Sequence, residues 1–141
     1  MKHNDSKKAM TKQRMLEYAE CYNSGDINLV VNEYYAESII FKKGFLVLEG
    51  RDAIKHWFTT LQSTFTEKLT FTNILLENDQ AAVVLDSEIT LKEDTPDLWG
   101  YGPAAKGAVL HGDFAAFYKF RGDKITHVTV YEMGVGDKTW R

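Results

Sequence analysis

The spacing of apolar side chains predicts three helices in the first half of the chain. In residues 11–23 the apolar positions recur at intervals of three and four, which places them on one helical face. They are Met15, Tyr18, Ala19 and Tyr22. Gly25 then suits the left-handed position just past a helix end, and Asp26 suits the N-cap of a second helix beginning at Ile27. A third helix is expected after Gly50.

Beyond the second helix, short runs rich in β-forming residues predict strands. Residues 38–43 and 45–49 flank Gly44 and predict a hairpin. After the third helix we expect strands at about 68–77, 81–92, 106–120 and 124–133. The long connection over residues 93–105 holds both prolines and Trp99, and it is either a lid over a pocket or a mobile hairpin tip.

Helices followed by antiparallel strands indicate an α+β fold, with the helices on one face of a curved sheet. In residues 108–120 the even positions form the better core face, and Phe114 and Tyr118 are among them. Both faces of residues 124–133 are partly apolar, and such a strand needs cover on both sides. We therefore expect a homodimer that forms through the outer face of the sheet.

Composition narrows the class of protein. A length of 141 residues predicts one domain, which we place at residues 11–141 after a flexible tail of residues 1–10. The net charge of −3 disfavours a nucleic-acid partner, and no apolar run approaches the roughly 20 residues of a membrane span. Cys21 is the single cysteine, which excludes an internal disulfide and favours a cytoplasmic location.

Metal and cofactor motifs are not recognised. The four histidines do not form His-x-His or His-Glu-x-x-His spacings, and no glycine-rich phosphate loop occurs, so we expect neither a metal nor a cofactor. His111 and Asp113 lie two apart on a predicted strand and hence on one face. This pair is either an acid/base unit or an ordinary solvent-facing pair.

The order of elements resembles a known family. Residues 11–133 resemble the nuclear transport factor 2-like superfamily in the order of their elements. These elements are a helix, the Asn-Ser-Gly-Asp junction at residues 23–26, a short aromatic helix, a hairpin, the Gly50-x-x-x-Ile54 helix start and a closing Gly-Asp-Lys-Ile strand. The SnoaL-like group is most similar, with ketosteroid isomerase and limonene epoxide hydrolase as relatives. The resemblance implies a cone, in which a curved antiparallel sheet (a half-barrel) and three helices enclose a pocket. A fold of this kind does not fix the function.

The resemblance to ketosteroid isomerases implies three catalytic groups, of which this chain keeps one. Tyr18 occupies the position of their helical tyrosine, seven residues before the junction glycine. The family's base would fall at Lys42-Lys43 and its second acid near Ala116, and neither place holds a carboxylate. Isomerisation by that mechanism is therefore not expected, and Tyr18 is either a hydrogen-bond donor to a ligand or an aromatic residue of the pocket wall.

Limonene epoxide hydrolases imply a site at Asp86-Ser87-Glu88, but the arginine of their trio is missing. Asp86 and Glu88 share a face and are either part of a site or exposed to solvent. The opposite face looks apolar, with Val83, Leu85, Ile89 and Leu91.

The closing strand supplies the remaining candidates. SnoaL-like cyclases often carry an acid near its end, and Glu132 shares the parity of Val128 and Val130, so it either enters the pocket or ends in solvent. We name Tyr18, Tyr118 and Glu132 as candidate catalytic residues. The candidate ligand-binding residues are Tyr22, Trp57, Leu61, Trp99, Phe114, Val128 and Val130. The expected ligand is a small, largely apolar molecule, either a substrate for cofactor-free isomerase, cyclase or dehydratase chemistry or the cargo of a non-catalytic binding or association module.

Overall fold

The two N-terminal helices meet at the predicted corner. In the computed structural model, which describes residues 8–98 and 102–132, α1 spans Lys12–Asn23 and α2 spans Ile27–Tyr34. The backbone of Gly25 has φ +84°, which an L side chain adopts only with strain. Asp26 caps α2, because its carboxylate accepts a hydrogen bond of 3.1 Å from the Leu29 N–H. The corner is thus built by local residue chemistry.

Six strands follow in the expected order, with α3 (Arg51–Gln62) between the second and the third. Their bounds are β1 Tyr35–Lys43, β2 Leu46–Glu49, β3 Phe65–Glu77, β4 Gln80–Leu91, β5 Val109–Arg121 and β6 Lys124–Glu132. They form one sheet in the order β2-β1-β6-β5-β4-β3. Most neighbours are antiparallel, but β1 and β6 pair in parallel, which the sequence did not predict.

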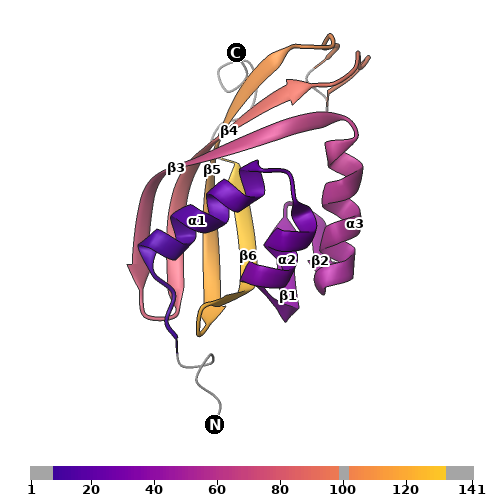
Figure 1. The fold of residues 1–141 in the computed structure, drawn as a ribbon. Helices are drawn as coiled ribbons and strands as arrows, with labels where there is room; N and C mark the ends of the chain where they lie inside the picture. Colours follow the sequence, from indigo (N-terminus) through magenta and orange to yellow (C-terminus); the bar gives the residue numbers. More distant parts are fainter. Residues whose placement is uncertain (1–7, 99–101, 133–141) are drawn as a thin grey trace.

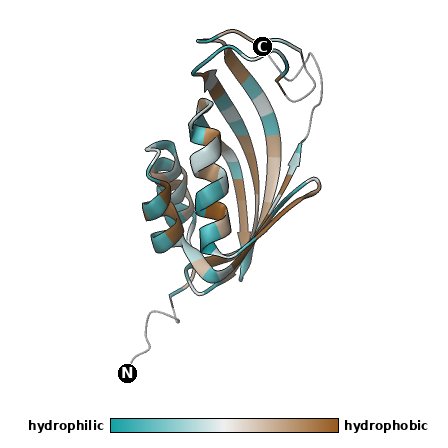
Figure 2. Cartoon of the chain, turned by 90° about the vertical axis from the view of Figure 1, so that its right-hand side faces the viewer, coloured by the Kyte–Doolittle hydropathy of each residue, from teal (hydrophilic) through white to brown (hydrophobic). Residues whose placement is uncertain are grey.

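The sheet curves, and all three helices lie on its concave side (Figure 1). α1 crosses the long strands, whereas α3 stands beside the β1–β2 hairpin. The view turned by 90° separates the helices from the sheet as two layers (Figure 2). The fold is therefore the open α+β cone expected from the sequence. None of the helices described here is long and apolar enough to cross a membrane.

The main core fills the space between the layers. Its fully buried members include Met15, Val30, Ile54 and Ile125. Met10, which the sequence analysis places in the tail, also belongs to this core with 4% of its surface exposed. A second, smaller cluster joins Leu98 of the long connection to the ends of β3 and β4.

Asn23, the last residue of α1, fixes that helix to β3. Its amide nitrogen donates to the Leu69 carbonyl at 2.8 Å, and its amide oxygen accepts from the Leu69 N–H at 2.7 Å. β3 is an end strand of the sheet, so these backbone groups have no strand neighbour on that side. The contact places the C-terminal turn of α1 against the pocket wall.

Candidate functional site

A cavity of about 740 Å³ lies between the helices and the concave face of the sheet. Its size falls within the usual range for small-molecule sites. All six strands and the helices α1 and α3 contribute to its wall. Aromatic and aliphatic side chains dominate the lining; the polar side chains are those of Tyr18, Tyr35, Lys43, Glu67, Ser87, Tyr118, Tyr131 and Glu132, with Trp57 contributing an indole N–H. A largely apolar ligand with a few polar groups fits such a wall.

Three buried tyrosines form one polar cluster in this wall. The hydroxyls of Tyr18 and Tyr35 are 2.8 Å apart and share a hydrogen bond, and the ring of Tyr118 packs edge-on against Tyr18. Burial raises the pKa of Tyr35 to about 12, and burial also raises the pKa values of Tyr18 and Tyr118 above the usual 10.0. All three are neutral phenols near pH 7. The Tyr18 hydroxyl also interacts with the Tyr118 hydroxyl, so two mutual bonds use two of the three phenol protons and the cluster keeps one proton to donate to a ligand.

Glu67 of β3 forms a second polar centre. The Tyr22 hydroxyl donates to Glu67 Oε1 at 2.6 Å, and the Ser87 hydroxyl donates to Glu67 Oε2. Burial, and then the negative charge of Glu67, raises the pKa of Tyr22 well above its ordinary value, so this phenol remains a donor. Two hydroxyls from α1 and β4 therefore hold one carboxylate in a fixed orientation at the cavity.

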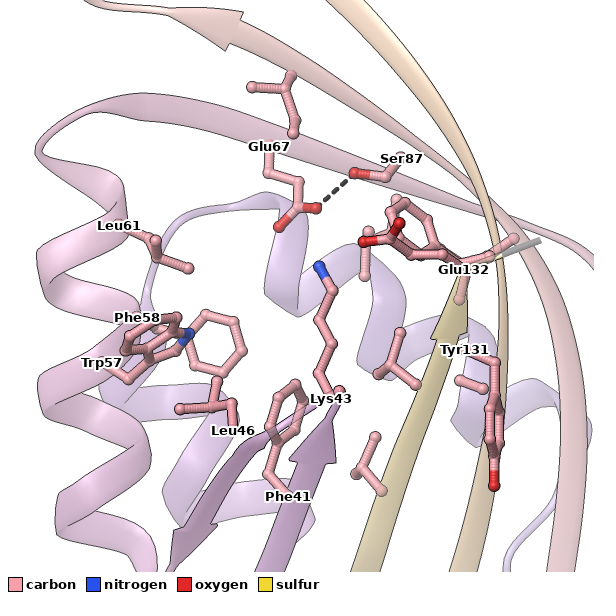
Figure 3. A pocket seen from close by; sticks show the side chains of 18 of the residues that line it. Phe41, Lys43, Leu46, Trp57, Phe58, Leu61, Glu67, Ser87, Tyr131 and Glu132 are labelled. Carbon is pink, nitrogen blue, oxygen red and sulfur yellow. Dashed lines mark hydrogen bonds between the residues drawn. The ribbon is translucent and has the colours of Figure 1, made fainter. Parts of the chain in front are cut away.

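Lys43 and Glu132 enter the same region from the ends of β1 and β6. Figure 3 shows the Lys43 amine pointing into the cavity, with the carboxylates of Glu67 and Glu132 directed toward it from two sides. The Lys43 amine also lies 4.8 Å from the centre of the Phe114 ring, a cation–π contact. Lys43 and Glu132 are exposed, which marks this region as the mouth of the cavity.

Most residues predicted for the site do line the cavity, and their functional roles stay predictions. Tyr18 and Tyr118 are only 3% and 2% exposed, whereas Glu132 lies at the mouth. The predicted ligand-binding residues in the wall are Trp57, Leu61, Phe114, Val128 and Val130. Tyr22 is not in the wall, because its hydroxyl is turned to Glu67 and its ring packs on Phe58. Trp99 lies outside the described residues.

Several polar lining residues were missed by the sequence analysis, and three of them, Glu67, Ser87 and Lys43, had a weak signal. Glu67 has the parity of Phe65 and Leu69, but the strand was expected to begin one residue later, at Lys68. The face of β4 taken as apolar includes Ser87, which is 1% exposed. Lys43 was noted only as a position without a carboxylate, although it has the inward parity of Phe41.

The polar pairs on β4 and β5 belong to the outer face of the sheet. Nδ1 of His111 lies 3.1 Å from Asp86 Oδ2, and Nε2 lies 3.4 Å from Glu88 Oε2. The partners of His111 are thus carboxylates of the neighbouring strand rather than Asp113, as the sequence had suggested. None of these residues lines the cavity, and this placement agrees with the solvent-facing alternative for His111 and Asp113. Within residues 8–98 and 102–132, no cluster of three or more His, Cys, Asp or Glu side chains could hold a metal ion.

Comparison with known proteins agrees with this cone. The family model of the SnoaL-like domain matches residues 15–128. The chain belongs to the SnoaL-like domain family. The comparison of this SnoaL-like domain with curated proteins finds no match.

Solved structures share the SnoaL-like fold at low sequence identity. A polyketide cyclase candidate from Xanthomonas campestris is 21% identical with a TM-score of 0.70, over 84% of this chain and 87% of its own. A second polyketide cyclase candidate, from Pseudomonas putida, is 20% identical with a TM-score of 0.70, over 86% and 90%. A limonene epoxide hydrolase-like enzyme from M. tuberculosis is 9% identical with a TM-score of 0.66, over 85% and 76%. At these identities the likeness establishes the nuclear transport factor 2-like fold of the SnoaL-like domain, and its chemistry must be argued from its own residues.

Proposed function

We propose that this protein binds a small, largely apolar ring compound bearing a carbonyl group and moves a proton on it, as an isomerase, cyclase or dehydratase does. The observation that carries the proposal is Glu67, a carboxylate oriented by Tyr22 and Ser87 at an otherwise mainly apolar cavity. An oriented carboxylate within reach of a ligand is a suitable general base. The polyketide cyclase candidates with the same fold are consistent with chemistry of this class.

The proposed step breaks a C–H bond beside the carbonyl group of the ligand. The proton passes to a free lone pair of Glu67, and the bonding electrons form a C=C bond while the carbonyl oxygen becomes an enolate. Neutral phenols of Tyr18 and Tyr118, or the Lys43 ammonium, donate hydrogen bonds to that oxygen. Return of the proton to a different carbon completes an isomerisation. Glu132, the base candidate from the sequence, lines the same cavity and is the alternative proton acceptor.

Proton exchange on a simple ring ketone tests this step without knowledge of the natural substrate. The probe is 2-tetralone in D₂O, and NMR follows the loss of its C–H signals beside the carbonyl group. We expect the protein to accelerate the exchange and Glu67→Gln to reduce the acceleration about 100-fold or more, the usual range for a general base. Glu88→Gln is the matched control, because Glu88 lies on the outer face of the sheet. Equal rates for the Glu67→Gln and unchanged proteins would remove Glu67 as the base.

A non-catalytic ligand-binding module is the second candidate function. It is favoured by Lys43 and Ala116, because both line the cavity at the places where ketosteroid isomerases would carry acids. This alternative predicts that 2-tetralone binds, as measured by calorimetry, without faster exchange in any variant. Binding together with faster exchange supports the enzyme.

A further inference from the structure

The charged side chains of Lys43, Glu67 and Glu132 line one cavity but do not form ion pairs with one another. Lys43 lies between the carboxylates of Glu67 and Glu132 in Figure 3, and yet the ion pairs of the described residues, which extend to 4.0 Å, include none of the three. The Lys43 amine is instead placed on the ring of Phe114. The mouth thus holds an ammonium group and a fixed carboxylate separated by more than one hydrogen-bond length.

A single atom that bridges such a pair must have two properties. It must accept a hydrogen bond from the Lys43 ammonium, which has three donors and no acceptor, and it must donate one to Glu67, which has only lone pairs. Among residues 8–98 and 102–132, Tyr22 and Ser87 donate hydrogen bonds to Glu67, one to each carboxylate oxygen. Each oxygen has a further lone pair for a ligand.

We propose that this site selects a ligand with a hydroxyl group, a phenol or an enol, that accepts from Lys43 and donates to Glu67. The inference rests on the proposed function and names the chemical group that the cavity recognises. A phenol or enol carries this hydroxyl on an apolar ring or chain, which would lie against the aromatic wall that includes Trp57, Phe58 and Phe114.

Other ligand groups interact favourably with only some of the charged side chains at the cavity mouth. An anionic ligand would meet Lys43 but also the negative charges of Glu67 and Glu132. An amine would meet the carboxylates and also Lys43. A carbonyl or ether oxygen accepts from Lys43 but leaves Glu67 without a donor from the ligand. A hydroxyl is neutral and satisfies both partners at once.

A matched pair of aromatic probes tests the inference. The compounds are 2-naphthol and 2-methoxynaphthalene, which differ in that the ether oxygen cannot donate a hydrogen bond. Calorimetry should show that 2-naphthol binds at least tenfold more tightly. Glu67→Leu should reduce this preference to less than threefold, because only the hydroxyl donates to Glu67. Glu67→Gln should reduce it in part, because a neutral amide oxygen accepts a weaker hydrogen bond than a carboxylate. Lys43→Met should weaken the binding of both probes by a similar factor, because both oxygens accept from Lys43.

Lys42→Met is the matched control. Lys42 is the preceding residue of β1, points to the opposite face and does not line the cavity, so this variant should keep the affinity for both probes. A preference for 2-naphthol caused only by the extra methyl group of the ether would persist in Glu67→Leu, and that result overturns the inference. Equal binding of the two probes overturns it as well.

The experiments distinguish failure of the hydroxyl inference from failure of the proposed function. If 2-tetralone binds and neither naphthalene derivative does, the hydroxyl inference falls and the pocket proposal stands. If 2-tetralone does not bind either, the proposed function falls together with the inference.

Discussion

Replacing Asn23 by alanine removes the contact that fixes α1 on β3. The change deletes both hydrogen bonds between the Asn23 amide and the Leu69 backbone, at 2.8 and 2.7 Å. The Leu69 N–H and C=O then lose their partners at a half-buried position on the end strand of the sheet. The adjacent Tyr22 would also be held less firmly against Glu67.

The expected loss of stability follows from these two bonds. Each contributes a net of roughly 0.5–1.5 kcal/mol, so together they contribute about 1–3 kcal/mol. Alanine offsets up to about 0.7 kcal/mol of this, because it favours a helix more than asparagine does. With the full offset the net loss is about 0.3–2.3 kcal/mol. For a domain of this size that corresponds to a fall in Tm of roughly 1–8 °C.

Thermal unfolding followed by circular dichroism measures this fall. Asn28→Ala is the control, because Asn28 is exposed on α2 and its side chain makes no hydrogen bond to the described residues. The control should keep the original Tm or rise slightly. If Asn23→Ala melts at the same temperature as the unchanged protein, the amide does not hold the helix, and the argument that it positions Tyr22 fails as well.

Two further predictions concern alkaline pH and assembly. Burial raises the pKa values of Tyr18, Tyr35 and Tyr118 above 10.0, so the folded state favours the neutral phenols. The stability that these phenols contribute is complete below about pH 10 and is lost as the pH rises through about 12. In a pH titration these hydroxyls should ionise, by ultraviolet absorbance, only as the near-ultraviolet circular dichroism disappears, and ionisation with that signal intact would contradict the burial argument. The outer face exposes Val84 (38%), so we expect a dimer of about twice 16.1 kDa in sedimentation and a monomer for Val84→Glu. A monomer of the unchanged protein at micromolar concentration would refute that expectation.

Local chemistry explains which parts of the fold could be predicted. Gly25 and Asp26 define the helix corner through their own backbone and side-chain preferences, so the sequence located it correctly. The parallel pairing of β1 with β6 joins segments far apart in the chain, and no local pattern indicates it. The register shift between Phe71 and Asn73 likewise changes which residues of β3 face inward, and periodicity alone does not reveal it.

The candidate site was predictable only where its residues are apolar or aromatic. Tyr18 and Tyr118 lie on apolar faces of regular elements, and that pattern led to them. Glu67 and Ser87 are polar residues at inward positions, and they become notable only when the two strands are seen to bring them together. Lys43 is the last residue of its strand, and the alternation of side chains predicts which face it points to only when the partner strands are known.

The asparagine of the helix corner has a consequence for how this chain behaves among its neighbours. An open sheet ends in strands whose free N–H and C=O groups can recruit a strand from another molecule and begin aggregation. Asn23 occupies such a pair of groups on Leu69 with a side-chain amide, which mimics the backbone of a neighbouring strand. The residue that fixes α1 on β3 therefore also occupies part of the sheet edge, so the position of this helix beside the cavity and the protection of the edge depend on the same amide.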